Sequence, residues 1–287
     1  WKSYEKINKK FCDRIIENID FGGTVWVHDY QLLLVPNMVR EQAPDAIIGF
    51  FNHIPFPSYE VFRTLPWRDE VLQGMLGADL IGFHTYDYER HFLSSVSRIL
   101  RHQVDFNQIT LPDRIVKVDS FPMGIDYKKF EQAALDHYES TSADQSELQK
   151  RLDHHLESTP DAKLILSIDR LDYTKGIAHR IRAYEYFLDK NPEYIEKVRL
   201  VMLAVPSRSN VPQYRRLKRE IDELVGRING KFSTVSWTPI WYFYRSMPFE
   251  NLIDLYTTCE IALLTPIRDG MNLVAKEYIA TRTDHTG

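Results

Sequence analysis

Residues 259–277 read CEIALLTPIRDGMNLVAKE. The apolar run 259–264 predicts a buried parallel strand, and the residues from Glu277 onward predict a helix. A ligand at the carboxyl edge of such a sheet meets the first backbone N–H groups of the helix, which favour anions. Gly270 lets a ligand approach the backbone closely, and Asp269 can accept hydrogen bonds from hydroxyls. The stretch therefore predicts a site for an anion beside a polyol. The alternative is that Asp269 caps the helix and Glu277 is a solvated charge.

The composition is that of a globular protein with one large or two ordinary domains, because 287 residues are 44% hydrophobic and 26% charged. The net charge of −4 provides no general attraction for nucleic acid or for an anionic membrane. The basic residues within 215–219 fall on the polar side of a helical stripe, which favours a solvated face over a nucleic-acid site. Cys12 and Cys259 are far apart and predict a reducing cytoplasmic location without disulfides or a metal site. No apolar run in the sequence approaches the length of a membrane span.

Strands and helices alternate along most of the chain, and this alternation predicts an α/β fold with parallel sheets. Each half of the sequence predicts a Rossmann-like, doubly wound domain. We expect domains at 1–135 and 162–287, joined by a helical connecting segment at 136–161. Strands are predicted at 24–30, 46–51, 79–83, 115–119, 163–169, 199–205, 234–237 and 259–264.

Cations stand where two predicted strands of the second half end. Arg170 and Lys175 lie five residues apart across one loop, and Arg208 follows the next strand. Two cations can hold a diphosphate from both sides and stabilise the negative charge that grows on it when a sugar departs. A plain surface charge is the alternative for each residue alone. That alternative weakens because these three cations, Asp269 and Glu277 all fall at or just beyond the carboxyl ends of strands.

Six motifs together resemble a known family in their order and spacing. They are HDYQL (28–32), HIPFP (53–57), FPMGID (121–126), DRLDYTKG (169–176), VPSR (205–208) and DGMNLVAKE (269–277). From about Trp26 onward the chain resembles the trehalose-6-phosphate synthase family, whose members are retaining glycosyltransferases of the GT-B type. The resemblance implies two Rossmann-like domains that face a cleft. It also implies an internal fragment, in which the first domain lacks its N-terminal strands and the second is truncated at its end.

The resemblance implies roles for the donor-binding residues. Arg170 and Lys175 would grip the diphosphate of UDP-glucose, and Glu277 would hold its ribose. Met247 would line the uracil pocket, although Ser246-Met247-Pro248 matches the family only loosely. The donor glucose and phosphate would be bound by Asp269, Gly270, Met271, Asn272, Leu273, Val274, Ala275 and Lys276.

The resemblance also implies roles at the acceptor. His53 would contact the donor sugar, Asp29 a sugar hydroxyl near the acceptor, and Arg208 the phosphate of glucose-6-phosphate. We expect His28 to be a structural partner of Asp29 and not a general base. The sequence provides no convincing pair of carboxylates for a double displacement, which favours a front-face substitution in which the departing phosphate oxygen takes the proton of the acceptor. No metal and no cofactor are expected.

The segments that the family uses to complete both substrate sites are expected to be missing, so we expect the 287-residue chain alone to have little or no transferase activity. Two alternatives stay open. Instead of a trehalose-6-phosphate synthase, the parent protein could be a regulatory, non-catalytic synthase-like subunit, or a related GT-B transferase with another phosphorylated sugar acceptor. Candidate partners of the parent protein are a second copy of itself, in a homo-oligomer, and a fused or separate trehalose-phosphate phosphatase.

Overall fold

The computed structural model describes residues 1–140, 145–159 and 162–286, and the chain divides into two compact units, Trp1–Met123 and Gly124–Gly287. Helices α6 (Tyr127–Glu139) and α7 (Glu147–Ser158) pack against helices of the second unit. The residues predicted to form a connecting segment, 136–161, therefore lie within that unit, although 141–144 and 160–161 are outside the described residues. The ring of Phe130 on α6, for example, lies edge-on to Phe249 at 5.3 Å.

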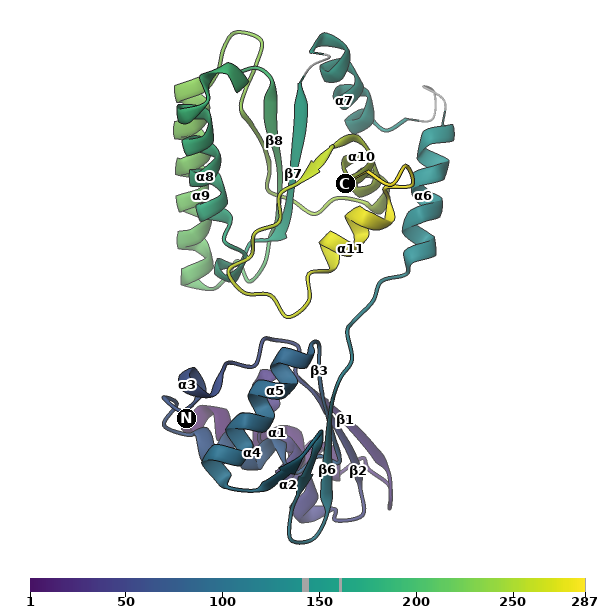
Figure 1. Ribbon diagram of the computed structural model, residues 1–287, viewed down its shortest axis with the longest axis vertical. Coiled ribbons are helices and arrows are strands. Elements are labelled where there is room, and N and C mark those ends of the chain that lie inside the picture. The colour runs from purple at the N-terminus through teal and green to yellow at the C-terminus, as the bar shows by residue number, and fades with distance from the viewer. Residues whose placement is uncertain (141–144, 160–161, 287) are drawn as a thin grey trace. The chain divides into compact units, whose positions relative to one another are not determined.

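The first unit is built on a six-stranded sheet (Figure 1). Its elements are α1 (Lys2–Ile16), β1 (Thr24–His28), the 3-10 turn η1 (Tyr30–Leu32), α2 (Val35–Gln42), β2 (Ile47–Phe51), α3 (Tyr59–Phe62), α4 (Arg68–Met75), β3 (Leu80–Phe83), α5 (Tyr86–Ser95), the π-helical turn η2 (Val96–Leu100), β4 (Gln103–Asp105), β5 (Gln108–Thr110) and β6 (Ile115–Ser120).

The strand order in this sheet is β1-β2-β3-β6-β5-β4, and β1, β2, β3 and β6 are parallel neighbours in chain order. Strand β1 alternates between exposed and buried residues, with Val25 and Val27 in the core, as expected for an edge strand with one covered face. The antiparallel strands β4 and β5 were not predicted, because three-residue strands are too short to show a period of two.

The second unit is built on a four-stranded parallel sheet. Besides α6 and α7 it contains β7 (Lys163–Arg170), η3 (Tyr173–Lys175), α8 (Ile177–Lys190), η4 (Pro192–Tyr194), β8 (Val198–Val205), α9 (Pro212–Phe232), β9 (Ile240–Phe243), α10 (Phe249–Thr258), β10 (Ile261–Ala262) and α11 (Leu273–Ala280).

Two hydrophobic layers cover the faces of the second sheet. Seven of the eight residues of β8 are buried, because β8 lies between β7 and β9 and is covered on both faces. Helices α8 and α9 pack on one face, with Ile181 and Ile221 in the layer (Figure 1). Helices α7, α10 and α11 contribute to the layer on the other face, which includes Leu152 and Tyr256.

Two strand predictions in the second half need correction. The strand predicted at 234–237 is wrong: the Thr234 N–H donates to the Trp237 carbonyl at 2.9 Å and closes a turn. The strand forms instead at β9, because the apolar run that begins at Ile240 pairs with β8 along its length. The strand predicted at 259–264 is reduced to β10, although the Leu263 N–H still donates to the Leu166 carbonyl at 2.7 Å.

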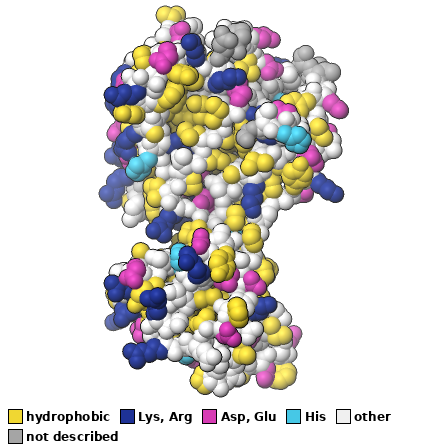
Figure 2. Space-filling view, viewed as in Figure 1, with side chains coloured by type: hydrophobic (Ala, Val, Ile, Leu, Met, Phe, Trp, Pro, Cys, Tyr) yellow, Lys and Arg dark blue, Asp and Glu magenta, His cyan; other side chains and the backbone are white. Residues whose placement is uncertain are grey.

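The surface mixes charges of both signs over the face of each unit that Figure 2 shows. Arg215, Arg216 and Arg219 are exposed on α9, as the helical stripe predicts. Within the described ranges, none of the helices combines the length and hydrophobicity that a transmembrane span requires.

Candidate functional site

The candidate site lies at the carboxyl edge of the second sheet. The strand order β10-β7-β8-β9 means that the chain runs outward from β7 to β9 and then returns to the other side of β7. The loops after β7 and β10 consequently lead to helices on opposite faces, α8 and α11. Ligands of open α/β sheets bind outside the carboxyl ends of strands at such a switch point. Lys175 follows β7 and Asp269 follows β10, so both belong to this junction.

An ion pair joins the two loops at the junction. The Lys175 ammonium donates to Asp269 Oδ2 at 2.5 Å, and only 13% and 18% of the two side chains are exposed. The backbone of the two loops is also bonded, since the Ile267 N–H donates to the Thr174 carbonyl at 2.9 Å. Gly176 takes a φ of 66°, and a Cβ there would lie 2.7 Å from the Thr265 carbonyl oxygen. The loops can therefore approach this closely only because residue 176 is glycine.

A buried arginine forms hydrogen bonds with both loops of the junction and with the end of β7. Arg180 on α8 donates to Asp169 Oδ2 at 2.7 Å and to Ser167 Oγ at 2.6 Å, at the end of β7. It also donates to Thr265 Oγ1 at 3.1 Å and to the Lys175 carbonyl at 3.3 Å. Both side chains of the Arg180–Asp169 ion pair are almost fully buried. Arg180 thus ties β7 to both loops.

The start of α11 completes this edge. Asn272 caps the helix, because its Oδ1 accepts from the Ala275 N–H at 2.9 Å, and its Nδ2 donates to Asp269 Oδ2 at 3.2 Å. The reading in which Asp269 caps the helix is therefore wrong. Residues 269–277 are all half-buried, including Gly270, Met271, Leu273, Val274, Ala275 and Lys276.

Glu277 lies one turn into α11 and is held by a tyrosine. The Tyr256 hydroxyl, from α10, donates to Glu277 Oε2 at 2.6 Å. Burial, followed by this hydrogen bond, raises the pKa of Tyr256 far above its ordinary value. Tyr256 consequently remains a hydrogen-bond donor at any working pH, and it fixes the orientation of the Glu277 carboxylate.

Two further cations follow neighbouring strands. Arg170 ends β7 and is exposed, and no described residue forms a hydrogen bond or ion pair with its guanidinium. Arg208 follows β8 in a left-handed conformation with a φ of 46°, and it donates to the Tyr214 hydroxyl at 2.9 Å. That hydroxyl donates to Asp172 Oδ2 at 2.9 Å. Burial of Asp172 opposes its ionisation, but hydrogen bonds from Thr174 and Tyr214 and the charge of Arg208 outweigh it and lower the pKa of Asp172.

Met247 is a separate case among the predicted residues of the second unit. It lies between β9 and α10, and it packs against the hydrophobic layer that contains Tyr256. A role toward uracil stays a prediction.

In the first unit, Asp29 and His53 come together at the ends of β1 and β2. The backbone N–H of His53 donates to Asp29 Oδ1 at 3.2 Å, and the backbone N–H of Asp29 donates to the Phe51 carbonyl at 2.8 Å. Asp29 adopts a φ of 73° and a ψ of 166°, a backbone conformation that residues other than glycine rarely take. Backbone strain of this kind is concentrated at functional sites.

The histidine side chains at this edge contact one another. His28 Nδ1 lies 2.9 Å from His53 Nε2, so the structural partner of His28 is His53 and not Asp29 as predicted. The ring of His84, at the end of β3, lies edge-on to that of His53 at 5.5 Å. Burial lowers the pKa of His53, the Asp29 charge opposes that shift, and His28 adds to it. His53 is therefore a neutral ring near pH 7.

Sequence reasoning missed Arg180, Tyr214 and Tyr256. Arg180 had a usable signal, because it lies on the apolar stripe of α8 between Ile177 and Ile181, where a cation must find a buried partner. Tyr214 and Tyr256 had no such signal in the sequence, since a tyrosine on the apolar face of a helix cannot be distinguished from an ordinary core residue.

Comparisons with known proteins place the chain in a family. The model of glycosyltransferase family 20 matches residues 1–287. The chain is 45% identical to a UDP-forming alpha,alpha-trehalose-phosphate synthase of Pichia angusta and covers 60% of that protein. Two solved structures are similar: a UDP-forming alpha,alpha-trehalose-phosphate synthase from Burkholderia xenovorans and the N-terminal domain of the Candida albicans trehalose-6-phosphate phosphatase.

The first structure has a TM-score of 0.87 and 35% identity, with 97% of this chain and 60% of that one covered. The second has a TM-score of 0.84 and 33% identity, with 98% and 58% covered. This chain thus spans about three fifths of the length of these relatives. The match over all 287 residues, together with the α/β fold of both units, shows that the chain belongs to glycosyltransferase family 20.

Proposed function

We propose that the protein to which this chain belongs transfers glucose from UDP-glucose to glucose-6-phosphate with retention of configuration, forming trehalose-6-phosphate and UDP. The observation that carries the proposal is the Lys175–Asp269 pair at the switch point between β7 and β10. A cation and a carboxylate held together at this position suit a sugar diphosphate, whose phosphates need positive charge and whose hydroxyls need acceptors. The trehalose-phosphate synthases that the chain resembles are described as UDP-forming.

The proposed roles follow the positions of the side chains. Arg170 and Lys175 bind the diphosphate, Asp269 and the start of α11 bind the glucose, and Glu277 binds the ribose. Arg208 binds the phosphate of the acceptor. Replacement of Arg208 by Ala should then remove the preference for glucose-6-phosphate over glucose, and an unchanged preference would mean another acceptor.

In the proposed front-face reaction, the acceptor hydroxyl attacks the anomeric carbon on the side from which the diphosphate leaves. The bond between that carbon and the diphosphate oxygen breaks, and the departing oxygen takes the hydroxyl proton. Arg170 and Lys175 stabilise the negative charge on the leaving group. Asp29 and His53 position sugar hydroxyls, since a neutral imidazole and a carboxylate are suited to hydrogen-bond them.

UDP release should be measured with the complete protein, UDP-glucose and glucose-6-phosphate. The variant Arg170→Ala should lower kcat by about 10²–10³-fold, the loss typical of one group that stabilises transition-state charge. It should leave folding intact, because no described residue is bonded to that guanidinium. Arg215→Ala, an exposed arginine of α9, is the matched control. Turnover within a few-fold of wild type in Arg170→Ala would contradict the proposal.

A second candidate function is regulation without catalysis. It is favoured by the similarity to a domain of a protein that is described as a phosphatase, which shows that the fold is not confined to proteins described as synthases. Binding of UDP-glucose by the complete protein without any release of UDP would support this candidate.

The similarity to the phosphatase domain also supports a fused or separate phosphatase partner. The two buried free thiols, Cys12 and Cys259, support a cytoplasmic location.

The activity of the 287-residue chain itself is a separate question. Because the chain spans about three fifths of its relatives, we propose that it binds UDP but turns over little or no UDP-glucose. Turnover by this chain comparable to that of the complete protein would contradict this part of the proposal.

A further inference from the structure

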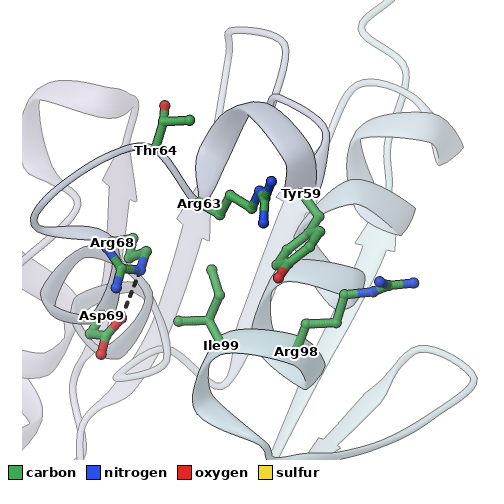
Figure 3. Close-up of a pocket in the computed structure, with 7 residues that line it drawn as sticks. All are labelled: Tyr59, Arg63, Thr64, Arg68, Asp69, Arg98 and Ile99. Atoms are coloured by element: carbon green, nitrogen blue, oxygen red, sulfur yellow. Dashed lines mark ion pairs between the residues drawn. The ribbon is translucent and has the colours of Figure 1, made fainter.

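A hollow on the surface of the first unit gathers three arginines (Figure 3). Its volume is about 490 Å³, and the arginines come from three different elements. Arg63 follows α3, Arg68 begins α4, and Arg98 belongs to η2. Tyr59 and Ile99 lie between Arg68 on one side and Arg98 on the other. None of these five residues belongs to the set proposed for glucosyl transfer.

The charges in the hollow are only partly balanced. Its lining contains three arginines and one aspartate, which leaves a surplus of two positive charges in a chain whose net charge is −4. Arg68 pairs loosely with Asp69 at 3.6 Å, and Arg63 pairs with Glu60 at 3.0 Å. Both pairs are exposed to water, so they hold the arginines weakly. Arg98 has no carboxylate within ion-pair distance among the described residues.

An aromatic ring lies between two of the cations. The guanidinium carbon of Arg98 is 5.0 Å from the centroid of the Tyr59 ring, and that of Arg63 is 5.9 Å from it. Both guanidinium groups are therefore kept near the ring by cation–π attraction. The Tyr59 hydroxyl forms no hydrogen bond with any residue that the structure describes. Two forked donors and a phenol hydroxyl thus line the same hollow.

We propose that this hollow binds the phosphate monoester of a small organic molecule. A guanidinium forms two-pronged hydrogen bonds with a phosphate or a carboxylate, but a phosphate monoester has three free oxygens and nearly two negative charges, so it can engage two guanidinium groups at once. The phosphate lies in the hollow beside the Tyr59 ring, where the long side chains of Arg63 and Arg98 can donate to it from either side of the ring. The organic part lies against the ring of Tyr59 and the side chain of Ile99. A volume of about 490 Å³ is within the range of small-molecule sites.

The isoleucine methyl groups provide a local test. In protein labelled at isoleucine methyl positions, the NMR signal of Ile99 reports on the hollow, and that of Ile109, fully buried in the core, serves as the reference. Glycerol 2-phosphate is the probe, and glycerol and potassium chloride at equal ionic strength are the controls. We expect a saturable shift at Ile99 with a Kd in the millimolar range or tighter, and no comparable shift with either control. Inorganic phosphate should bind more weakly than the ester, since it lacks the organic part.

The matched variants are Arg98→Gln and Arg101→Gln. Both remove an exposed arginine near the end of the same helix, but Arg101 does not line the hollow. Arg98→Gln should weaken binding of glycerol 2-phosphate about tenfold or more, as expected for the loss of one charge-assisted contact, whereas Arg101→Gln should not. Unchanged signals from Ile109 will show that both variants are folded.

Three results would overturn the proposal. The first is the absence of a saturable shift at Ile99 with glycerol 2-phosphate or inorganic phosphate at concentrations up to about 10 mM. Binding weaker than that would correspond to less free energy than one good charged contact provides. The second is equal weakening in Arg98→Gln and Arg101→Gln. The third is a response of Ile99 to single-stranded RNA but not to glycerol 2-phosphate, because the hollow would then contact a phosphate backbone and not a small molecule.

Discussion

The carboxyl edges of the two sheets differ in chemistry, although both follow the same alternation of strands and helices. In the second unit the edge is a switch point between β7 and β10, and charged side chains are locked there by Lys175–Asp269 and Arg180–Asp169. In the first unit the described parallel strands follow one another in chain order, without a switch. That edge holds the contacting rings of His28, His53 and His84, with the pKa of His53 lowered by burial, and the strained Asp29. One edge is suited to phosphate and the other to hydroxyl groups.

The largest expected effect concerns the buried pair of the second unit. Arg180→Met should destabilise that unit by about 3–5 kcal/mol, because the carboxylate of Asp169 would stay buried without its partner. Hydrogen exchange measured on peptides of each unit will show how much stability the second unit loses and how much the first unit loses. In the first unit, Arg40 bonds Asp79 at 2.8 Å, but 41% of the Asp79 side chain is exposed, so Arg40→Met should cost less. Equal losses of stability from Arg180→Met and Arg40→Met would show that the buried ion pair of the second unit is no more important than the half-exposed pair of the first.

The second effect concerns acid stability. Burial, together with the charges of Arg199 and His154, lowers the pKa of His155 on α7 from 6.5 to about 4. In the unfolded chain His155 binds a proton below pH 6.5, whereas in the folded unit it binds one only near pH 4. The free energy of unfolding of this unit therefore falls as the pH drops from 6.5 to 4. The loss should reach roughly 3 kcal/mol at pH 4. Denaturant titrations at pH 7 and pH 4.5 should show a smaller pH effect in His155→Phe than in wild type.

The third effect tests whether the orientation of Glu277 matters. Tyr256→Phe removes only the hydroxyl that donates to Glu277, and UDP binding should weaken about tenfold. Tyr278→Phe is the control, because that buried hydroxyl donates to the Cys259 carbonyl and not to Glu277. The defect of Tyr256→Phe should shrink with a 2′,3′-dideoxy analogue of UDP, if Glu277 binds the ribose. An equal defect with both nucleotides would mean that the hydroxyl only supports folding, and equal binding of both by wild type would contradict the ribose contact.

The smallest effect concerns the strain at Asp29. Both Asp29→Gly and Asp29→Ala remove the carboxylate, but only glycine adopts a φ of 73° and a ψ of 166° without strain. The glycine variant should therefore be more stable than the alanine variant by about 1–2 kcal/mol, and both should lose activity. Thermal unfolding of the two variants side by side measures the difference. Equal stability would show that the edge of the first unit stores no strain.

The sequence by itself determined the α/β class, most strands and the family, because periodicity and short motifs are local properties that residues 259–277 already display. It failed at 234–237, where a short β-prone run closes a turn and the longer run from Ile240 pairs with β8. Only the tertiary structure decided that Lys175 meets Asp269 and that Tyr256 holds Glu277. Those contacts join residues up to 94 positions apart, as in Lys175–Asp269. They depend on which strands become neighbours, and no local pattern specifies the order β10-β7-β8-β9.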